Sequence, residues 1–138
     1  MSNIAILEYK DYREPEVLAL YRSVGWSAYY REPDTLRRAF ENSLLTLAAF
    51  DGEKLVGMLR VVGDGETIIF LQDILVHPDY RRRGIGRALI TELLLRYQHV
   101  RQLHLLTDDT PDTVGFYKAV GFTPAEEIHC KTFTRLKY

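Results

Sequence analysis

Three consecutive apolar runs, separated by two short turns, constrain the fold of this chain more than any other feature. The runs cover residues 44–50, 55–62 and 67–76 and are rich in residues that favour strands. Asp51-Gly52 is a strong hairpin pair between the first two runs, and Gly63-Asp64-Gly65 forms a second turn before the third. Turns this short join neighbouring strands in antiparallel order. The sequence therefore predicts an antiparallel three-stranded meander.

The segments on either side of the meander are predicted mainly as helices. Residues 4–9 form a short strand, and two helices then begin near Pro15 and Pro33, because proline is favoured in the first helical turn. After the meander, the sequence predicts a helix over about 84–97, a strand over 102–106, a helix opened by Thr110 and a final strand over 128–136. The order βααβββαβαβ implies an α/β (α+β) fold with a mixed, mostly antiparallel central sheet and helices on both faces.

Length, charge and cysteine content restrict the class of protein. The 138 residues, 46% of them hydrophobic, are sufficient for a single domain over 1–138. A net charge of −1 gives no global attraction to nucleic acid or to an anionic membrane, and no apolar run is long enough for a membrane helix. One cysteine and no signal-peptide pattern favour a cytoplasmic protein. The four histidines lack ligand spacing, so no metal site is expected.

A basic stretch at residues 77–87 stands apart from this balanced background. It holds four arginines and one aspartate, and Gly84 and Gly86 lie where a helix begins. Unpaired N–H groups at a helix N-terminus attract anions, and glycine lets an anion approach the backbone. The stretch therefore predicts a phosphate or pyrophosphate site. It fails the dinucleotide fingerprint, since Leu89 occupies the sixth position, and it lacks the Walker A residues. A nucleic-acid patch remains an alternative interpretation.

Two motifs carry a resemblance to a known family. Arg81-Arg82-Arg83-Gly84-Ile85-Gly86 resembles the Arg/Gln-x-x-Gly-x-Gly/Ala signature of the GNAT superfamily of N-acetyltransferases, and it follows a long strand and precedes a long helix. Phe116-Tyr117-Lys118-Ala119-Val120-Gly121-Phe122 is similar to the family's Phe-Tyr-x-x-x-Gly-Phe segment. The resemblance implies a small, single-domain, bacterial-type member that transfers acetyl from acetyl-CoA to a primary amine of a small molecule, by direct attack in a ternary complex.

The resemblance also implies a cofactor site built largely from main-chain groups. The strand before the basic loop would pair with the pantetheine arm, and the N–H of Val76 would stabilise the developing oxyanion. The loop and the start of the helix would hold the pyrophosphate. The residues implied are Ile74, Leu75 and Val76 for pantetheine, and Arg81, Arg82, Arg83, Gly84, Ile85, Gly86 and Arg87 for pyrophosphate.

Proton transfer needs an acid and a base. By resemblance, Tyr117 would protonate the departing CoA thiolate; without the motif, a tyrosine beside Phe116 is more typical of a core aromatic. For the base, Asp73 is the first choice because it shares a strand face with Leu75, and a structural carboxylate is the alternative. Asp108 and Asp109 are further candidates, and a turn or capping role is more typical for Asp109. For His77, a solvated loop residue is the alternative interpretation.

The acceptor pocket would lie in the connection between the first two helices. Trp26, Tyr29 and Tyr30 are costly to expose without a purpose, and such rings can receive an aromatic amine or a cation. The alternative is that Trp26 fills the core beneath the helices. Leu20-Tyr21-x-x-Val24-Gly25-Trp26 also resembles small bacterial members related to plant arylalkylamine-type acetyltransferases, which suggests a small amine.

Other functions remain open at this stage. A non-catalytic acyl-CoA sensor or interaction module would keep the anion site without a productive base. A covalent route is disfavoured, because Cys130 is the only thiol and nothing near it in the sequence would activate it. A homodimer is a further expectation, and the final strand over 128–136 is one candidate interface.

Overall fold

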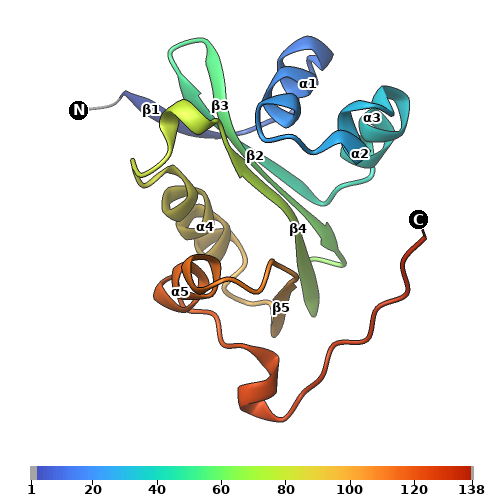
Figure 1. Ribbon diagram of the computed structural model, residues 1–138, viewed down its shortest axis with the longest axis vertical. Helices are drawn as coiled ribbons and strands as arrows, with labels where there is room; N and C mark the ends of the chain where they lie inside the picture. Colours follow the sequence, from blue (N-terminus) through green and yellow to red (C-terminus); the bar gives the residue numbers. More distant parts are fainter. Residues whose placement is uncertain (1–2, 138) are drawn as a thin grey trace. The chain divides into compact units, whose positions relative to one another are not determined.

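The computed structural model describes residues 3–137 and divides into two compact units, with the boundary after Leu106. The first unit is built on a five-stranded sheet in the order β1-β2-β3-β4-β5 (Figure 1). Neighbouring strands are antiparallel except for β4 and β5, which are parallel, so the predicted mixed sheet is confirmed. The strands are β1 (Ile4–Glu8), β2 (Leu45–Asp51), β3 (Lys54–Gly63), β4 (Ile68–Val76) and β5 (Gln102–Leu105).

Helices cover both faces of this sheet, as predicted. One face carries α1 (Glu14–Ser23), α2 (Ser27–Tyr30) and α3 (Pro33–Glu41), and the other carries α4 (Ile85–Arg96) (Figure 1). Proline lies in the first turn of α1 and of α3, as the sequence indicates. The short helix α2 is an addition that the sequence did not predict. Each face has its own apolar core, with Val17, Leu20, Tyr21, Leu36 and Met58 on the first and Ile85, Leu89, Ile90 and Leu93 on α4.

The second unit contains α5 (Pro111–Ala119) and a 3-10 turn (Ala125–Ile128). The hydroxyl oxygen of Thr110 accepts a hydrogen bond from the Thr113 N–H at 3.3 Å, which confirms the predicted helix cap. The predicted final strand over 128–136 is wrong: within the described part of the chain, residues 129–137 belong to no helix or strand. Alternating, β-branched sequence supports a strand only when a partner completes the ladder, because β-propensity depends on context.

Candidate active site

The strands β4 and β5 diverge halfway along β4. Their parallel pairing runs from Ile68–Gln102 to Leu71–Leu105 and stops there, although β4 continues to Val76. The pairing of β4 with β3 shifts register at the same point, so that Gln72 has no partner on β3. A bulge of this kind bends a strand and often lies beside an active site. The last four residues of β4 therefore keep β3 on one side and are open on the other.

Main-chain groups of two predicted residues face this open side. The N–H of His77 donates to the carbonyl oxygen of Val56 on β3 at 2.8 Å. Because the N–H and C=O groups of successive strand residues point to opposite sides, those of Val76 and Ile74 point away from β3. Leu75, between them, directs its main chain toward β3 and its side chain into the core. The divergent strands thus leave a free donor and acceptor edge at Ile74 and Val76.

This edge leads into the basic loop, whose backbone adopts two left-handed residues. Arg82 has φ of 64° and Gly84 has φ of 78°, and Gly84 is the N-cap of α4. No side chain caps this helix, and an atom added at the Gly84 Cβ position would meet nothing within 4 Å. The first N–H groups of α4 are therefore accessible from solvent and carry the positive end of the helix dipole. Such a concave N–H arrangement can bind a pyrophosphate.

The arginines of the loop add positive charge to this cradle. Among the described residues, none of Arg81, Arg82, Arg83 and Arg87 forms an ion pair with a carboxylate, so their charge is available to an anion. The Arg83 guanidinium lies 4.7 Å from the centroid of the Tyr80 ring. Tyr80 in turn donates a 2.6 Å hydrogen bond to Asp51, which fastens the start of the loop to the β2–β3 hairpin.

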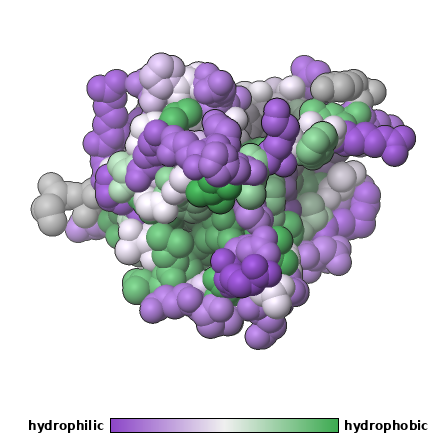
Figure 2. Space-filling model, turned by 90° about the horizontal axis from the view of Figure 1, so that it is seen from below, coloured by the Kyte–Doolittle hydropathy of each residue, from purple (hydrophilic) through white to green (hydrophobic). Residues whose placement is uncertain are grey.

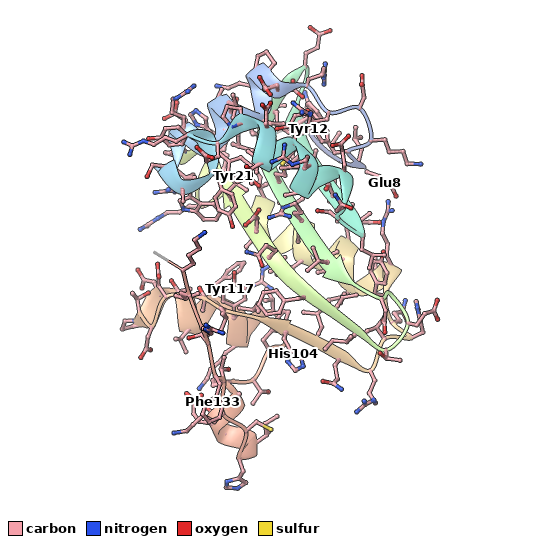
Figure 3. The ribbon with its side chains drawn as sticks, turned by 90° about the vertical axis from the view of Figure 1, so that its right-hand side faces the viewer. Glu8, Tyr12, Tyr21, His104, Tyr117 and Phe133 are labelled. Atoms are coloured by element: carbon pink, nitrogen blue, oxygen red, sulfur yellow. The ribbon has the colours of Figure 1, made fainter. Side chains whose placement is uncertain are left out.

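Asp73 lies on the face of β4 that α1 covers, and it is buried. Its Oδ2 accepts hydrogen bonds from the Arg60 Nε at 2.8 Å and from the Tyr21 hydroxyl at 2.9 Å, and the Arg60 Nη2 is also 2.8 Å away. Arg60 is its direct partner across β3 and β4, and both side chains are at most 6% exposed. Figure 3 shows Tyr21 reaching from the helical layer toward the strands. Asp73 is therefore a member of a closed, charge-balanced network and offers no free face to solvent.

This network perturbs two tyrosines. Burial, and then the negative charge of Asp73, raise the pKa of Tyr21 well above its ordinary value. Burial also raises the pKa of Tyr29, and the negative charge of the Asp73 carboxylate raises it further. Unlike Tyr21, Tyr29 is only half-buried, and its hydroxyl accepts a 3.2 Å hydrogen bond from the exposed Gln72 at the bulge. Tyr29 therefore connects Asp73 to the surface where β4 and β5 diverge.

The predicted acceptor aromatics gather around the same point. The ring centroids of Trp26 and Tyr29 are 6.0 Å apart, and each lies within about 6 Å of Tyr21, at 6.0 and 5.3 Å. All three predicted rings are partly buried against the α1 core, so packing explains part of their area. Tyr30 lies under the Arg22 guanidinium at 5.0 Å and faces a different neighbour. The geometry thus separates Trp26 and Tyr29, whose rings pack against Tyr21, from Tyr30.

Tyr117 belongs to the second unit. It lies on α5 between Phe116 and Phe122, with ring centroids 5.1 and 5.8 Å away. Burial raises the pKa of Tyr117, and a hydrogen bond with Thr107 acts in the opposite direction. The phenol is therefore held protonated over the physiological pH range. Cys130, in the same unit, is exposed.

Sequence reasoning missed three residues of this region: Arg60, Gln72 and Tyr80. A signal for Arg60 was present, because Arg60 and Asp73 are lone, opposite charges within apolar runs of adjacent strands, and such charges are rarely buried unpaired. The bulge at Gln72 has no comparable signature.

Among the described residues, no helix is long and apolar enough to cross a membrane.

Comparison with known proteins identifies the family to which this fold and site belong. The sequence model of the acetyltransferase (GNAT) family matches residues 8–122. A GNAT family acetyltransferase from Streptococcus pneumoniae TIGR4 has 35% sequence identity and a TM-score of 0.88, and the alignment covers 97% of this chain and 98% of that one. The chain therefore belongs to the GNAT acetyltransferase family.

Two curated relatives extend the comparison. The uncharacterized N-acetyltransferase ycf52 of Gracilaria tenuistipitata var. liui is 32% identical over 72% of this chain and 56% of its own length. Serotonin N-acetyltransferase 2, chloroplastic, of Oryza sativa subsp. japonica is 34% identical over 67% of this chain and 48% of its own length. The chain thus spans about half the length of these relatives.

Proposed function

We propose that this protein transfers the acetyl group of acetyl-CoA to the primary amine of a small molecule, by direct attack in a ternary complex. The observation that carries the proposal is the open main-chain edge at Ile74 and Val76, which leads directly to the N–H cradle at Gly84. An extended chain with amide groups, ending in a pyrophosphate, matches that combination of a strand edge and a helix N-terminus.

Different residues bind different parts of acetyl-CoA. The cradle of residues 81–87 holds the pyrophosphate through N–H groups, with the arginine side chains as additional counter-charges. Ile74 and Val76 pair with the pantetheine amides. The N–H of Val76 donates to the thioester carbonyl oxygen, where negative charge develops, and a fixed donor of this kind contributes about 3 kcal/mol in related oxyanion sites.

Proton transfer is assigned to two separate tyrosines. Tyr117 is proposed as the acid that protonates the thiolate, a role supported by its family motif. We assign Asp73 a positioning role: it fixes the Tyr21 hydroxyl, and the Tyr21 ring packs against Tyr29, which contacts the incoming amine. Because Arg60 and Tyr21 already occupy the Asp73 Oδ2, any direct proton acceptance by Asp73 falls to Oδ1.

The acceptor proposed is an amine carried by an aromatic group. Trp26 and Tyr29 present a half-buried aromatic surface beside the divergent strands, where an indole or phenyl ring can stack. The rice relative is named a serotonin N-acetyltransferase, which is consistent with such a substrate. A cationic polyamine is the second candidate, because the same rings also attract ammonium groups.

Turnover tests the proposal directly. The Cys130→Ser variant, which carries no thiol of its own, is mixed with acetyl-CoA and with tryptamine, tyramine or spermidine, and release of free CoA is followed with a thiol reagent. We expect faster release with the two aromatic amines and the same rates with wild type measured by product mass. Saturable acetyl-CoA binding without turnover of any amine would favour the alternative, an acyl-CoA sensor. Absence of binding at millimolar acetyl-CoA would overturn both.

A further inference from the structure

Tyr80, at the start of the basic loop, is fixed at two points. Its N–H donates to the carbonyl oxygen of His77 at 2.8 Å, within the short 3-10 turn Pro78–Tyr80. Its hydroxyl donates at 2.6 Å to Asp51, the last residue of β2, and Figure 1 shows this turn beside the β2–β3 hairpin. The hydrogen bond to Asp51, and then burial, raise the pKa of Tyr80, so its hydroxyl remains a donor over the physiological pH range. The Tyr80 ring is therefore held in one place beside the hairpin.

This ring distinguishes Arg83 from the other arginines of the loop. The guanidinium carbon of Arg83 lies 4.7 Å from the centroid of the Tyr80 ring. In the described part of the chain, the arginines at 81, 82 and 87 form neither an ion pair nor a contact of this kind with a ring. Figure 2 shows hydrophilic side chains projecting into solvent on the face that it displays, so exposure alone does not mark a binding residue. The particular feature of Arg83 is its contact with a ring that is itself held in place.

An arginine that is ordered before its ligand arrives binds an anion more tightly than a free one. A free arginine side chain samples many rotamers, and binding a phosphate in one of them costs conformational entropy. The face of a tyrosine ring attracts a guanidinium and leaves its in-plane N–H donors free. An acidic partner would order the side chain as well, but it would neutralise the charge that the phosphate needs. Tyr80 therefore lowers the entropic cost for Arg83 and preserves its charge.

Lys54 is a second cation beside the same ring. Its Nζ lies 5.4 Å from the centroid of the Tyr80 ring. Lys54 begins β3 and pairs with Asp51 across the hairpin, so it belongs to the sheet. Arg83 directly precedes Gly84, the N-cap of α4, whose first N–H groups are accessible. Of these two cations, Arg83 is the one that combines the ring contact with a place in the cradle.

We propose that Tyr80 is a positioning residue for acetyl-CoA: its ring, anchored to Asp51, holds the Arg83 guanidinium beside Gly84, where it binds the pyrophosphate. The inference rests on the proposed function, because it takes acetyl-CoA to be the ligand of the cradle. Tyr80 does not touch the cofactor in this role. Because it acts through one arginine, its effect on binding should disappear when that arginine is absent.

A double-variant cycle, measured by calorimetric titration with acetyl-CoA, tests this dependence. Arg83→Gln is expected to weaken binding about tenfold, the usual effect of losing a charge-assisted hydrogen bond. Tyr80→Leu is expected to weaken it about threefold to fivefold, the usual effect of losing an exposed cation–ring contact. Adding Tyr80→Leu to Arg83→Gln should cause no further loss. Adding it to Lys54→Gln or to Arg81→Gln should still weaken binding about threefold or more, because those sites are independent of the Tyr80–Arg83 contact.

A matched tyrosine controls for a general loss of stability. Tyr9 donates a 2.7 Å hydrogen bond to Glu16, so it resembles Tyr80 in having a carboxylate partner. Tyr80→Phe and Tyr9→Phe each remove one such bond and keep the ring. Tyr80→Phe should weaken acetyl-CoA binding about threefold, because the ring beneath Arg83 loses its anchor, whereas Tyr9→Phe should bind as the wild type does. Circular dichroism checks that the variants keep their fold.

The outcomes separate this inference from the proposed function. A wild type that does not bind millimolar acetyl-CoA overturns both. Wild-type binding together with an equal loss from Tyr80→Leu in the native and the Arg83→Gln proteins overturns only the role of Tyr80, since the tyrosine then acts independently of Arg83. Loss of the Tyr80→Leu effect in the Lys54→Gln protein overturns the assignment to Arg83. Equal weakening by Tyr9→Phe and Tyr80→Phe also overturns it, because any lost tyrosine–carboxylate bond would then suffice.

Discussion

The buried Arg60–Asp73 pair gives the sharpest test of how this sheet is held together. Asp73→Asn keeps the shape of the side chain but removes its charge, and it leaves the Arg60 guanidinium, 6% exposed, without a counter-ion. Arg60→Met is the reciprocal change, and it leaves the Asp73 carboxylate with only the Tyr21 hydroxyl at 2.9 Å. Either variant leaves an unpaired charge buried inside the protein.

The size of the effect follows from burial. Removing one partner of a buried, hydrogen-bonded pair costs about 3–5 kcal/mol, which is a large part of a typical stability of about 5–15 kcal/mol. At about 3 °C per kcal/mol for a chain of this size, each single variant should unfold about 10–15 °C below wild type. Combining Arg60→Met with Asp73→Leu removes both charges and leaves only the Tyr21 hydroxyl unpaired, at about 1–3 kcal/mol. The double variant should therefore be more stable than either single one.

Urea unfolding of the wild type, the two single variants and the double variant ranks their free energies of unfolding. The matched control is the exposed pair Arg37–Asp34, whose 2.9 Å separation is close to the 2.8 Å of the buried pair. Here Arg37→Met or Asp34→Asn should cost less than about 1 kcal/mol. If Asp73→Asn is as mild as Asp34→Asn, or if the double variant is less stable than both singles, the argument from a desolvated ion pair is wrong.

Three further outcomes are expected. Gly84→Glu should abolish acetyl-CoA binding in calorimetry. The control variant Gly25→Glu, at a glycine with a similar φ of 76° and equally open space, should bind acetyl-CoA as the wild type does. Equal loss of binding in both variants would implicate backbone strain instead. Tyr117→Phe should lower kcat by about 100-fold or more, with little change in acetyl-CoA affinity, since a general acid acts only in the transition state. An unchanged kcat would remove Tyr117 from the mechanism. Hydrogen bonds from the Thr67 hydroxyl and the N–H groups of residues 66–68 hold the pKa of Asp64 well below its ordinary value. The stabilisation by Asp64 is therefore complete above its unfolded pKa of about 3.9 and is lost as pH falls below that value. Asp64→Asn should flatten the decline of the urea midpoint below about pH 4. An identical decline of the urea midpoint in the variant and the wild type would contradict this.

The sequence alone was sufficient for the central architecture. Glycine-containing turns at 51–52 and 63–65 separate three apolar runs, and the structure forms the predicted antiparallel strands β2, β3 and β4 there. Prolines at 15 and 33 and the cap at Thr110 mark helix starts correctly. These features are local: a turn, a cap or a φ restriction acts on the few residues around it, so it can be read without knowing the fold.

The backbone geometry of the basic loop was also readable from sequence, because it depends on consecutive residues. Gly84 adopts the left-handed φ that glycine permits, and the uncapped start of α4 follows it. The left-handed Arg82 was not foreseen, since a non-glycine residue with positive φ carries no sequence signal.

Tertiary structure alone decided what depends on partners distant in sequence. Asp73 was assigned to proton transfer from its place on a strand, but Arg60, 13 residues away, and Tyr21, 52 residues away, enclose its carboxylate. The alternation over 128–136 predicted a strand, yet described residues 129–137 belong to no helix or strand. Local propensity sets what a segment can become, whereas burial, ion pairing and strand pairing depend on which other segment folding brings against it.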